Sequence, residues 1–380
     1  MKKDWIEFIS KKEIQIVIYL IINSLFVLKY TPRYNLNPYL SLVVYFGLVY
    51  AAYFIYRKVS TFGTEKLFKI LYWTSLILAV GAISISLIYI DRYTIRVDRW
   101  SALTFFWDAA FNGHYPYGAH THVSATNFPS PFPVWHLIGL PFYLLGDVGY
   151  QIIFFLILFA FVIKCYFSSY KKSFFFLMLL LISPSYWWEV IVRSDSFSNS
   201  LLVFMIICLF VKYKRDLSNS FVLIIFICGA IASTRFTAIL PLTLFLFQPY
   251  LHLTIKKKII FPITILGIAF LSFLPFIFWD TSTWIFFKRN PFMSQTGNGN
   301  FYLLLLMIIL GIIMALRWRD IQQFFSITSI FIFIFILSSQ IVYLESKGNA
   351  NFFSDGIVDI SYFNLALPYC LARLTSSLRF

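Results

Sequence analysis

The residues best suited to chemistry are concentrated between 91 and 147, in a polar segment that separates long apolar runs. Carboxylates, guanidinium groups and imidazoles stand close together there, and such groups can move protons, bind anions or hold a metal. Ionisable side chains beside apolar runs are costly unless they are well paired or have a function. This segment is therefore where a reaction site is expected. Its ionisable residues are Asp91, Arg92, Arg96, Asp98, Arg99, Asp108, His114, His120, His122 and His136.

The stretch 98–112 is predicted to form a short amphipathic helix. Apolar residues recur at helical spacing along one face, and Asp98 and Asp108 lie on the opposite side. Gly113 is suited to end the helix, and residues 115–117, which include a proline, cannot continue it. Because tryptophans favour the headgroup region, we expect the helix to lie on the membrane with Asp98 near its start. The alternative is a surface helix with solvated acids. The expected apolar face consists of Trp100, Leu103, Trp107, Ala110 and Phe111.

The histidines of this segment give a weaker signal. His120 and His122 form a His-x-His pair with His114 nearby, and histidine is a common metal ligand. Catalytic Mg²⁺ or Mn²⁺ would instead be held by carboxylate oxygens. We therefore expect the histidines to contact solvent or substrate. We expect no cofactor, with a divalent metal ion as the alternative.

A second polar group, Arg193-Ser194-Asp195, begins an apolar run close to Trp187, Trp188 and Glu189. Aromatic rings beside an acid can bind a sugar, because the ring stacks on the sugar face and the acid bonds its hydroxyl groups. One alternative is an interfacial tryptophan belt with a local ion pair between Arg193 and Asp195. Another is that Ser194 or Asp195 simply caps the helix.

Arg235 interrupts the apolar stretch 231–236. It could extend from a helix end toward water, as long basic side chains do at membrane boundaries. It could equally contact a phosphate group in a cavity, and the sequence leaves both open.

The composition indicates a polytopic membrane protein. Hydrophobic residues make up 60% of the 380 and charged residues 12%, about half the charge of a typical soluble domain. A bilayer crossing needs roughly 20 apolar residues, and such runs follow one another almost end to end. The formal net charge of +15 comes from basic clusters between these runs. That pattern indicates membrane topology rather than nucleic-acid binding.

Basic clusters occupy every second loop between the apolar runs. Because positive loops are retained on the cytoplasmic side, one orientation satisfies all of them. Both termini are then cytoplasmic, the membrane is the cell inner (plasma) membrane, and 91–148 faces outward. The stretch 133–147, with 15 residues and an internal Pro141, is too short to cross and is predicted to be an interfacial helix. The expected transmembrane runs lie near 12–29, 39–56, 68–90, 149–168, 173–190, 197–211, 219–233, 236–253, 259–279, 301–316, 321–343 and 358–376.

The outward segment carries an ordered set of motifs. Asp98 and the amphipathic helix are followed by the Gly-His-Tyr-Pro-Tyr sequence 113–117. The proline-rich sequence 127–133 comes next, and then an apolar stretch that ends at Gly146-Asp147. This order resembles the first outer loop of the GT-C superfamily of integral membrane glycosyltransferases, which includes mannosyltransferases. In that family an acidic residue follows an early transmembrane helix, and a proline-rich start of a further helix comes later.

The resemblance implies an all-α fold and an activity. The whole chain, 1–380, would be a single transmembrane domain of about 12 helices, with 91–148 as the outer loop that carries interfacial helices and the active site. GT-C enzymes transfer a sugar from a polyprenyl-phosphate carrier to an acceptor on the outer, periplasmic face. The expected partners are therefore a polyprenyl-phosphate sugar donor, a glycan or lipid acceptor and membrane lipids, with no nucleic acid.

The resemblance also implies roles for particular residues. A carboxylate would take the proton of the acceptor hydroxyl, with Asp98 as the first candidate and Asp108 as the second. The donor phosphate would need cations, and guanidinium groups suit phosphate. The predicted substrate-binding residues are Arg99, His114, Tyr117, His120, Trp188, Arg193, Asp195 and Arg235.

Two other classes of protein remain open. A polysaccharide polymerase of the O-antigen type would be expected to place functional arginines in long loops of its second half, whereas the long loop here is in the first half. A flippase or transporter of lipid-linked sugars would favour internal repeats and acids buried at midplane. No repeat is evident, and the acids gather at the membrane boundary instead.

Overall fold

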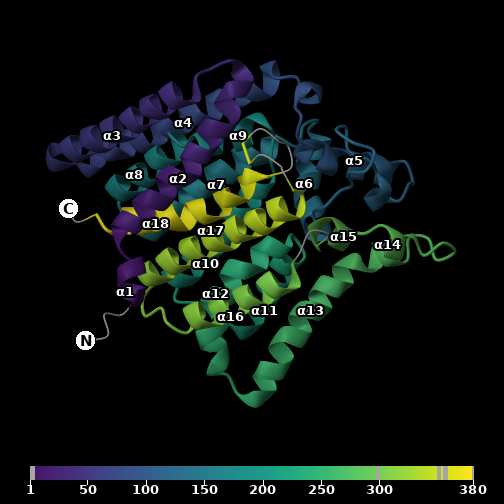
Figure 1. Cartoon of the computed structure of the whole chain (residues 1–380). Coiled ribbons are helices and arrows are strands. Elements are labelled where there is room, and N and C mark those ends of the chain that lie inside the picture. Colours follow the sequence, from purple (N-terminus) through teal and green to yellow (C-terminus); the bar gives the residue numbers. More distant parts are fainter. Residues whose placement is uncertain (1–4, 297–299, 349–351, 354–357, 379–380) are drawn as a thin grey trace. The chain divides into compact units, whose positions relative to one another are not determined.

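The computed structural model of the chain describes residues 5–296, 300–348, 352–353 and 358–378 (Figure 1). All described residues lie in helices, turns or loops and none in a strand, which confirms the predicted all-α class. The chain divides into two compact units. Unit 1 comprises Met1–Ile83, Ile157–Glu189 and Asn300–Phe380, and unit 2 comprises Ser84–Leu156 and Val190–Gly299.

Six helices among the described residues are long and apolar enough to cross a membrane. A bent pair of helices adds a seventh if it counts as one span. Four further apolar helices are shorter, with 12 to 17 residues each. The six long helices are α2 (Lys12–Tyr30), α3 (Pro38–Phe62), α4 (Glu65–Tyr89), α7 (Tyr150–Phe167), α13 (Ile255–Ile277) and α17 (Ile321–Ser346). The shorter ones are α10 (Ser196–Lys212), α11 (Phe221–Ala232), α12 (Phe236–Leu251) and α16 (Phe301–Ala315).

Two of the predicted transmembrane runs are not single α-helices. The run 173–190 forms α8 (Tyr170–Leu181) and α9 (Pro184–Ile191), which are bent by 64°. The run 358–376 forms the 3₁₀-helix η4 (Ile360–Ala366) followed by α18 (Leu367–Ser376). A proline stands at or near the start of both α9 and α18. Proline has no N–H for the helical ladder, so a helix is readily interrupted just before it.

Unit 1 has a core formed by α18, which packs against α2 and α17. Polar side chains join these helices inside the unit. The Ser329 hydroxyl donates to the side-chain carbonyl of Gln15, and the Cys370 thiol donates to the Gln15 carbonyl at 2.9 Å. Such bonds between helices are a common way to hold apolar helices together in lipid.

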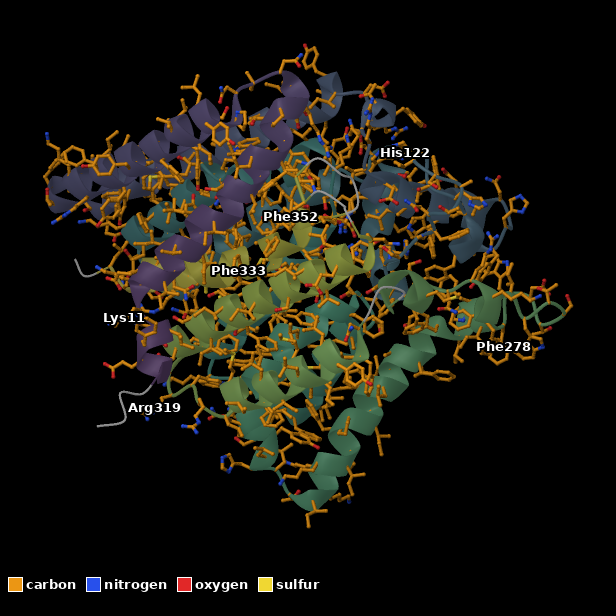
Figure 2. All side chains as sticks on the ribbon, in the orientation of Figure 1. Lys11, His122, Phe278, Arg319, Phe333 and Phe352 are labelled. Carbon is orange, nitrogen blue, oxygen red and sulfur yellow. The ribbon has the colours of Figure 1, made fainter. Side chains whose placement is uncertain are left out.

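Two basic clusters predicted to share one side of the membrane lie at the same end of unit 1. Lys11 directly precedes α2, and Arg319 stands just before α17 (Figure 2). Arg373 of α18 connects the two regions, because its guanidinium donates to the carbonyl of Ser10 at 2.8 Å and to the side chain of Gln322 at 3.3 Å.

Unit 2 holds two short helices of the polar segment, α5 (Arg99–Phe111) and α6 (Pro133–Leu144), together with α10 to α13. Unit 2 also contains α14 (Ile285–Lys288) and α15 (Pro291–Thr296). The helices α11 and α13 pack along each other at Gly229, where a Cβ atom would lie 2.7 Å from the Cβ of Ile268. Only glycine permits this approach. By contrast, Gly267 of α13 has no atom within 4 Å of its would-be Cβ.

Replacing Gly229 by alanine should therefore destabilise unit 2, by about 1–3 kcal/mol, because it overpacks a tight helix contact. Thermal unfolding of the purified chain in detergent measures this effect. The matched control is Gly267→Ala, which should leave the unfolding temperature unchanged or slightly raised. Equal behaviour of the two variants would contradict the close approach of α11 and α13.

Candidate functional site

Asp98 stands immediately before α5, but its side chain does not cap that helix. Its carboxylate is bound instead by the loop that follows. The Asn127 amide donates to Oδ2 at 2.9 Å, and the Thr121 hydroxyl lies 3.5 Å from the same oxygen. The side chain is half-buried. Asp98, the predicted base, is therefore a partly accessible carboxylate whose orientation is set by two neutral donors.

The helix α5 confirms the prediction for 98–112 in extent but not in the face that it buries. Trp100, Leu103 and Phe106 are buried, whereas Phe111 is 61% exposed. The expectation of one apolar stripe along the whole helix is therefore wrong. The reason is that α5 packs through its first turns against α6 and the 3₁₀-helix η3 (Pro116–Gly118). The helix ends as predicted, because Gly113 follows it with a φ of +74°, which favours glycine.

The histidines of the loop have different roles. His122 is held between two groups of the Asp98 region, with Nδ1 2.7 Å from the Ser101 hydroxyl and Nε2 2.7 Å from the Ile95 carbonyl. His114 and His120 are exposed, as expected for residues that contact solvent or substrate. Within the described ranges, no three His, Cys, Asp or Glu side chains are grouped so that they could hold a metal ion.

Tyr117 and His136 belong to the core beneath α5. The Tyr117 hydroxyl donates to the Pro131 carbonyl at 3.2 Å, and burial raises its pKa. The His136 ring stacks on Phe106 with 3.5 Å between centroids, and burial lowers its pKa. Tyr117 is therefore a packing residue in this conformation, and its predicted contact with substrate stays a prediction.

Asp108, the second candidate base, is already engaged. Its Oδ1 accepts a hydrogen bond from the Tyr143 hydroxyl at 2.7 Å. This bond raises the pKa of Tyr143, because the phenol proton is held by the carboxylate. The Asp108–Tyr143 bond also joins α5 to the end of α6. Arg99, the first residue of α5, is buried.

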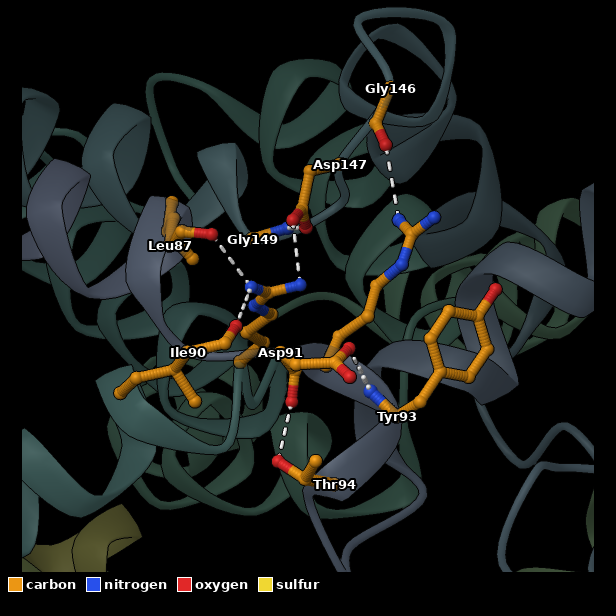
Figure 3. Close-up of polar contacts among 10 residues, drawn as sticks. Leu87, Ile90, Asp91, Tyr93, Thr94, Gly146, Asp147 and Gly149 are labelled. Carbon is orange, nitrogen blue, oxygen red and sulfur yellow. Dashed lines mark hydrogen bonds and ion pairs between the residues drawn. The ribbon is translucent and has the colours of Figure 1, made fainter.

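Arg193 is paired with Asp147 rather than with its neighbour in sequence (Figure 3). Its Nη1 lies 2.8 Å from the Asp147 carboxylate, and its Nη2 donates to the carbonyls of Leu87 and Ile90, each at 2.8 Å. Gly149 leaves room for this arrangement, since a Cβ there would approach a Leu87 methyl carbon to 2.6 Å. The alternative of a local Arg193–Asp195 pair is therefore wrong.

A physical cause is visible in the backbone at 193. Arg193 adopts a φ of +52°, a left-handed conformation that is rare for residues other than glycine. This turn directs Arg193 to the carbonyls at the end of α4, while Asp195 contacts Trp135 and Arg235. Arg92 donates to the Gly146 carbonyl at 3.2 Å (Figure 3). Its guanidinium carbon also lies 5.2 Å from the centre of the Trp100 ring, so Arg92 connects the same loops.

Asp195 and Arg235 form a buried ion pair through the Asp195 Oδ2 atom. The indole N–H of Trp135 donates to the same oxygen at 2.6 Å. Both members of the pair are at most 5% exposed, so Arg235 does not extend toward water as one interpretation of the sequence held. The side chain of Asp195 makes no capping bond to α10 either, which excludes the capping interpretation for this residue.

Trp188 belongs to unit 1, whereas the other candidate residues belong to unit 2. Its ring stacks on Tyr30 at 5.1 Å and meets Phe26 edge-on at 5.5 Å. The neighbouring Glu189 accepts a hydrogen bond from Asn364 at 2.7 Å. These contacts account for Trp188 as a packing residue, and its binding of a sugar stays a prediction.

The packing of segment 284–296 on the polar loop was not predicted from the sequence. The Tyr115 hydroxyl donates to the Arg289 carbonyl at 2.7 Å, and the Arg289 guanidinium carbon lies 4.4 Å from the centre of the Phe128 ring. Gln295 donates to the Ser130 carbonyl through its amide. A signal was available, because aromatic residues recur in 284–292 at a density that is unusual for a solvated loop.

Comparison with family models, with characterised proteins and with solved structures gives no match for this chain. The assignment of a function therefore depends on the residues and their geometry.

The buried ion pair provides a test of the site's architecture. Asp195→Asn should lower the free energy of unfolding by about 3–5 kcal/mol, because it leaves the Arg235 guanidinium buried without a counter-charge. Thermal unfolding in detergent measures the loss. The double variant Asp195→Leu with Arg235→Met removes both charges and should recover much of the stability. A single variant as stable as the wild type would contradict the pairing.

Proposed function

We propose that this chain is a GT-C-like hexosyltransferase of the cell inner membrane. It transfers a sugar from a polyprenyl-phosphate-linked donor to a glycan or lipid acceptor on the outer, periplasmic face. The single observation that carries the proposal is the Asp98 carboxylate, which is partly accessible, does not cap its helix and is oriented by Asn127 and Thr121.

Transfer of a sugar to an acceptor hydroxyl needs a base, and the proposal gives this role to Asp98. The acceptor hydroxyl oxygen bonds to the anomeric carbon of the sugar as the bond from that carbon to the phosphate oxygen breaks, and the hydroxyl proton passes to a carboxylate. Asn127 and Thr121 both bind Oδ2 of Asp98, and among the described residues none bonds to Oδ1. That oxygen can therefore meet an acceptor hydroxyl. Asp108 is less suited, because Tyr143 already donates to it.

The proposal includes about 12 membrane crossings with both termini in the cytoplasm. The common end of α2 and α17, where the basic residues Lys11 and Arg319 lie, supports a shared cytoplasmic side for these clusters. The crossings beyond the six or seven long ones are assigned to the four shorter apolar helices and to the segment formed by η4 and α18. Short spans are accommodated by local thinning of the bilayer at modest cost.

Asp98→Asn should reduce sugar transfer at least about 100-fold, because a positioned general base contributes roughly 10²–10⁴-fold in rate. Asparagine is nearly the same size, so the fold should survive, and an unchanged unfolding temperature verifies this. Asp108→Asn is the matched control and should reduce transfer less than about tenfold.

The measurement is transfer of labelled sugar from polyprenyl-phosphate donors by the purified chain in lipid vesicles. Unchanged transfer by Asp98→Asn would contradict the role of Asp98. Movement of the intact donor across the vesicle membrane, independent of Asp98, would favour a flippase instead.

A further inference from the structure

Two of the arginines predicted to bind the donor phosphate are occupied by carboxylates. Arg193 pairs with Asp147 and Arg235 with Asp195, and both guanidinium groups are at most 5% exposed. A phosphate at either position would meet the carboxylate of the pair and gain no net positive charge. Arg99 is buried as well. The donor phosphate therefore needs a cation that lies at the surface and is not already neutralised.

Arg289 meets these requirements. Its side chain is exposed, and no described carboxylate forms an ion pair with it. The guanidinium carbon lies 4.4 Å from the centre of the Phe128 ring, a favourable cation–π geometry. The backbone is fixed at this residue, because its carbonyl accepts the Tyr115 hydroxyl at 2.7 Å. The main chain of Arg289 is thus held by a hydrogen bond, and its charged guanidinium group packs against an aromatic ring.

One loop connects this cation to the proposed base. Asn127 donates to the Asp98 carboxylate at 2.9 Å. The ring of the next residue, Phe128, packs against the Arg289 guanidinium group. Gln295 fixes the same loop further along, through bonds to the Ser130 carbonyl and the backbone N–H of Phe236. Base and cation are therefore held by successive residues, and they remain separate groups rather than neutralising each other.

We infer that Arg289, supported by Phe128, binds the phosphate of the lipid-linked donor beside Asp98. This inference rests on the proposed function. A guanidinium group can bind two phosphate oxygens at once, which fixes the orientation of the phosphate as well as its position. A cation there leaves Asp98 free to serve the acceptor.

The surroundings of Arg289 match a lipid phosphate rather than a soluble one. Trp284 directly precedes α14 and Phe287 lies within it, and they are 47% and 65% exposed. Exposed aromatic residues next to basic ones are typical of the headgroup level of a membrane, where aromatic rings meet the upper acyl chains and cations meet phosphate. A polyprenyl phosphate has the same division between an apolar chain and an anionic head.

Binding of undecaprenyl monophosphate to the full chain in phosphatidylcholine nanodiscs tests the inference, with undecaprenol as the phosphate-free probe. The wild type should prefer the phosphate to the alcohol. Arg289→Gln should raise the Kd for the phosphate about tenfold, as expected for the loss of a charge-assisted contact, and should not change binding of the alcohol. The matched control is Lys288→Gln, which removes an exposed cation next in sequence and should change the Kd less than about twofold. Phe128→Leu keeps the charge but removes the ring and should give an intermediate loss.

The outcomes separate this inference from the proposed function. If Arg289→Gln and Lys288→Gln behave alike while Asp98→Asn abolishes transfer, the inference is wrong and the proposed function stands. If phosphatidylglycerol competes as well as undecaprenyl monophosphate, the site binds lipid headgroups in general and the donor assignment is overturned. If phosphate binding depends on Arg289 but the wild type transfers no sugar, the proposed function fails while the phosphate site remains.

Discussion

The buried ion pair between Asp195 and Arg235 is the interaction on which the arrangement of unit 2 depends. Asp195 stands at the start of α10, Arg235 directly precedes α12, and Trp135 of α6 donates to the same carboxylate oxygen. Three helices therefore meet at one carboxylate in an apolar setting. Separating them would leave a charge buried without a partner, which is far more costly than losing a hydrogen bond at the surface. The ion pair holds α6 in place, and α5 packs against α6. The position of Asp98, at the start of α5, therefore depends on the Asp195–Arg235 pair.

A second ion pair completes the frame around the polar segment. Arg193 and Asp147 join the loop after α9 to the loop before α7, and the Arg193 guanidinium also satisfies two carbonyls near the end of α4 (Figure 3). Arg193 and Arg235 were predicted to bind substrate, but in the structure they form buried ion pairs that connect helices and loops of unit 2. Asp98, by contrast, is partly accessible, and Arg289, which packs on Phe128 next to Asn127, is exposed. An accessible base and an accessible cation are what transfer of a sugar from a phosphate requires.

Local features of the polar segment could be predicted from the sequence because they depend on neighbouring residues. The extent of α5, its end at Gly113 and the short helix that begins at Pro133 all follow from helical periodicity and from the properties of glycine and proline. The number of membrane crossings was harder to predict from the sequence. Hydropathy counts apolar residues, whereas the length of a helix also depends on where a proline such as Pro184 interrupts it.

The pairing of charges could not be predicted, because it depends on tertiary structure. Arg193 and Asp195 are two residues apart, and a local pair is the simplest expectation. The left-handed turn at Arg193 instead sends the two side chains to partners far away in sequence. The packing of Arg289 on Phe128 likewise joins segments that no local pattern connects. The sequence therefore indicates the candidate segment, but it does not indicate that Arg193 and Arg235 are paired with carboxylates.

The most direct test of the central claim is made on the wild-type chain. The purified protein in lipid vesicles is incubated with a set of polyprenyl-phosphate sugars and a membrane extract as the source of acceptors, and release of free polyprenyl phosphate is followed by mass spectrometry. A sugar transferase should release polyprenyl phosphate from at least one donor, in amounts that match the sugar gained by an acceptor. If every donor stays intact in the presence of the extract, or crosses the membrane unchanged, the account is wrong.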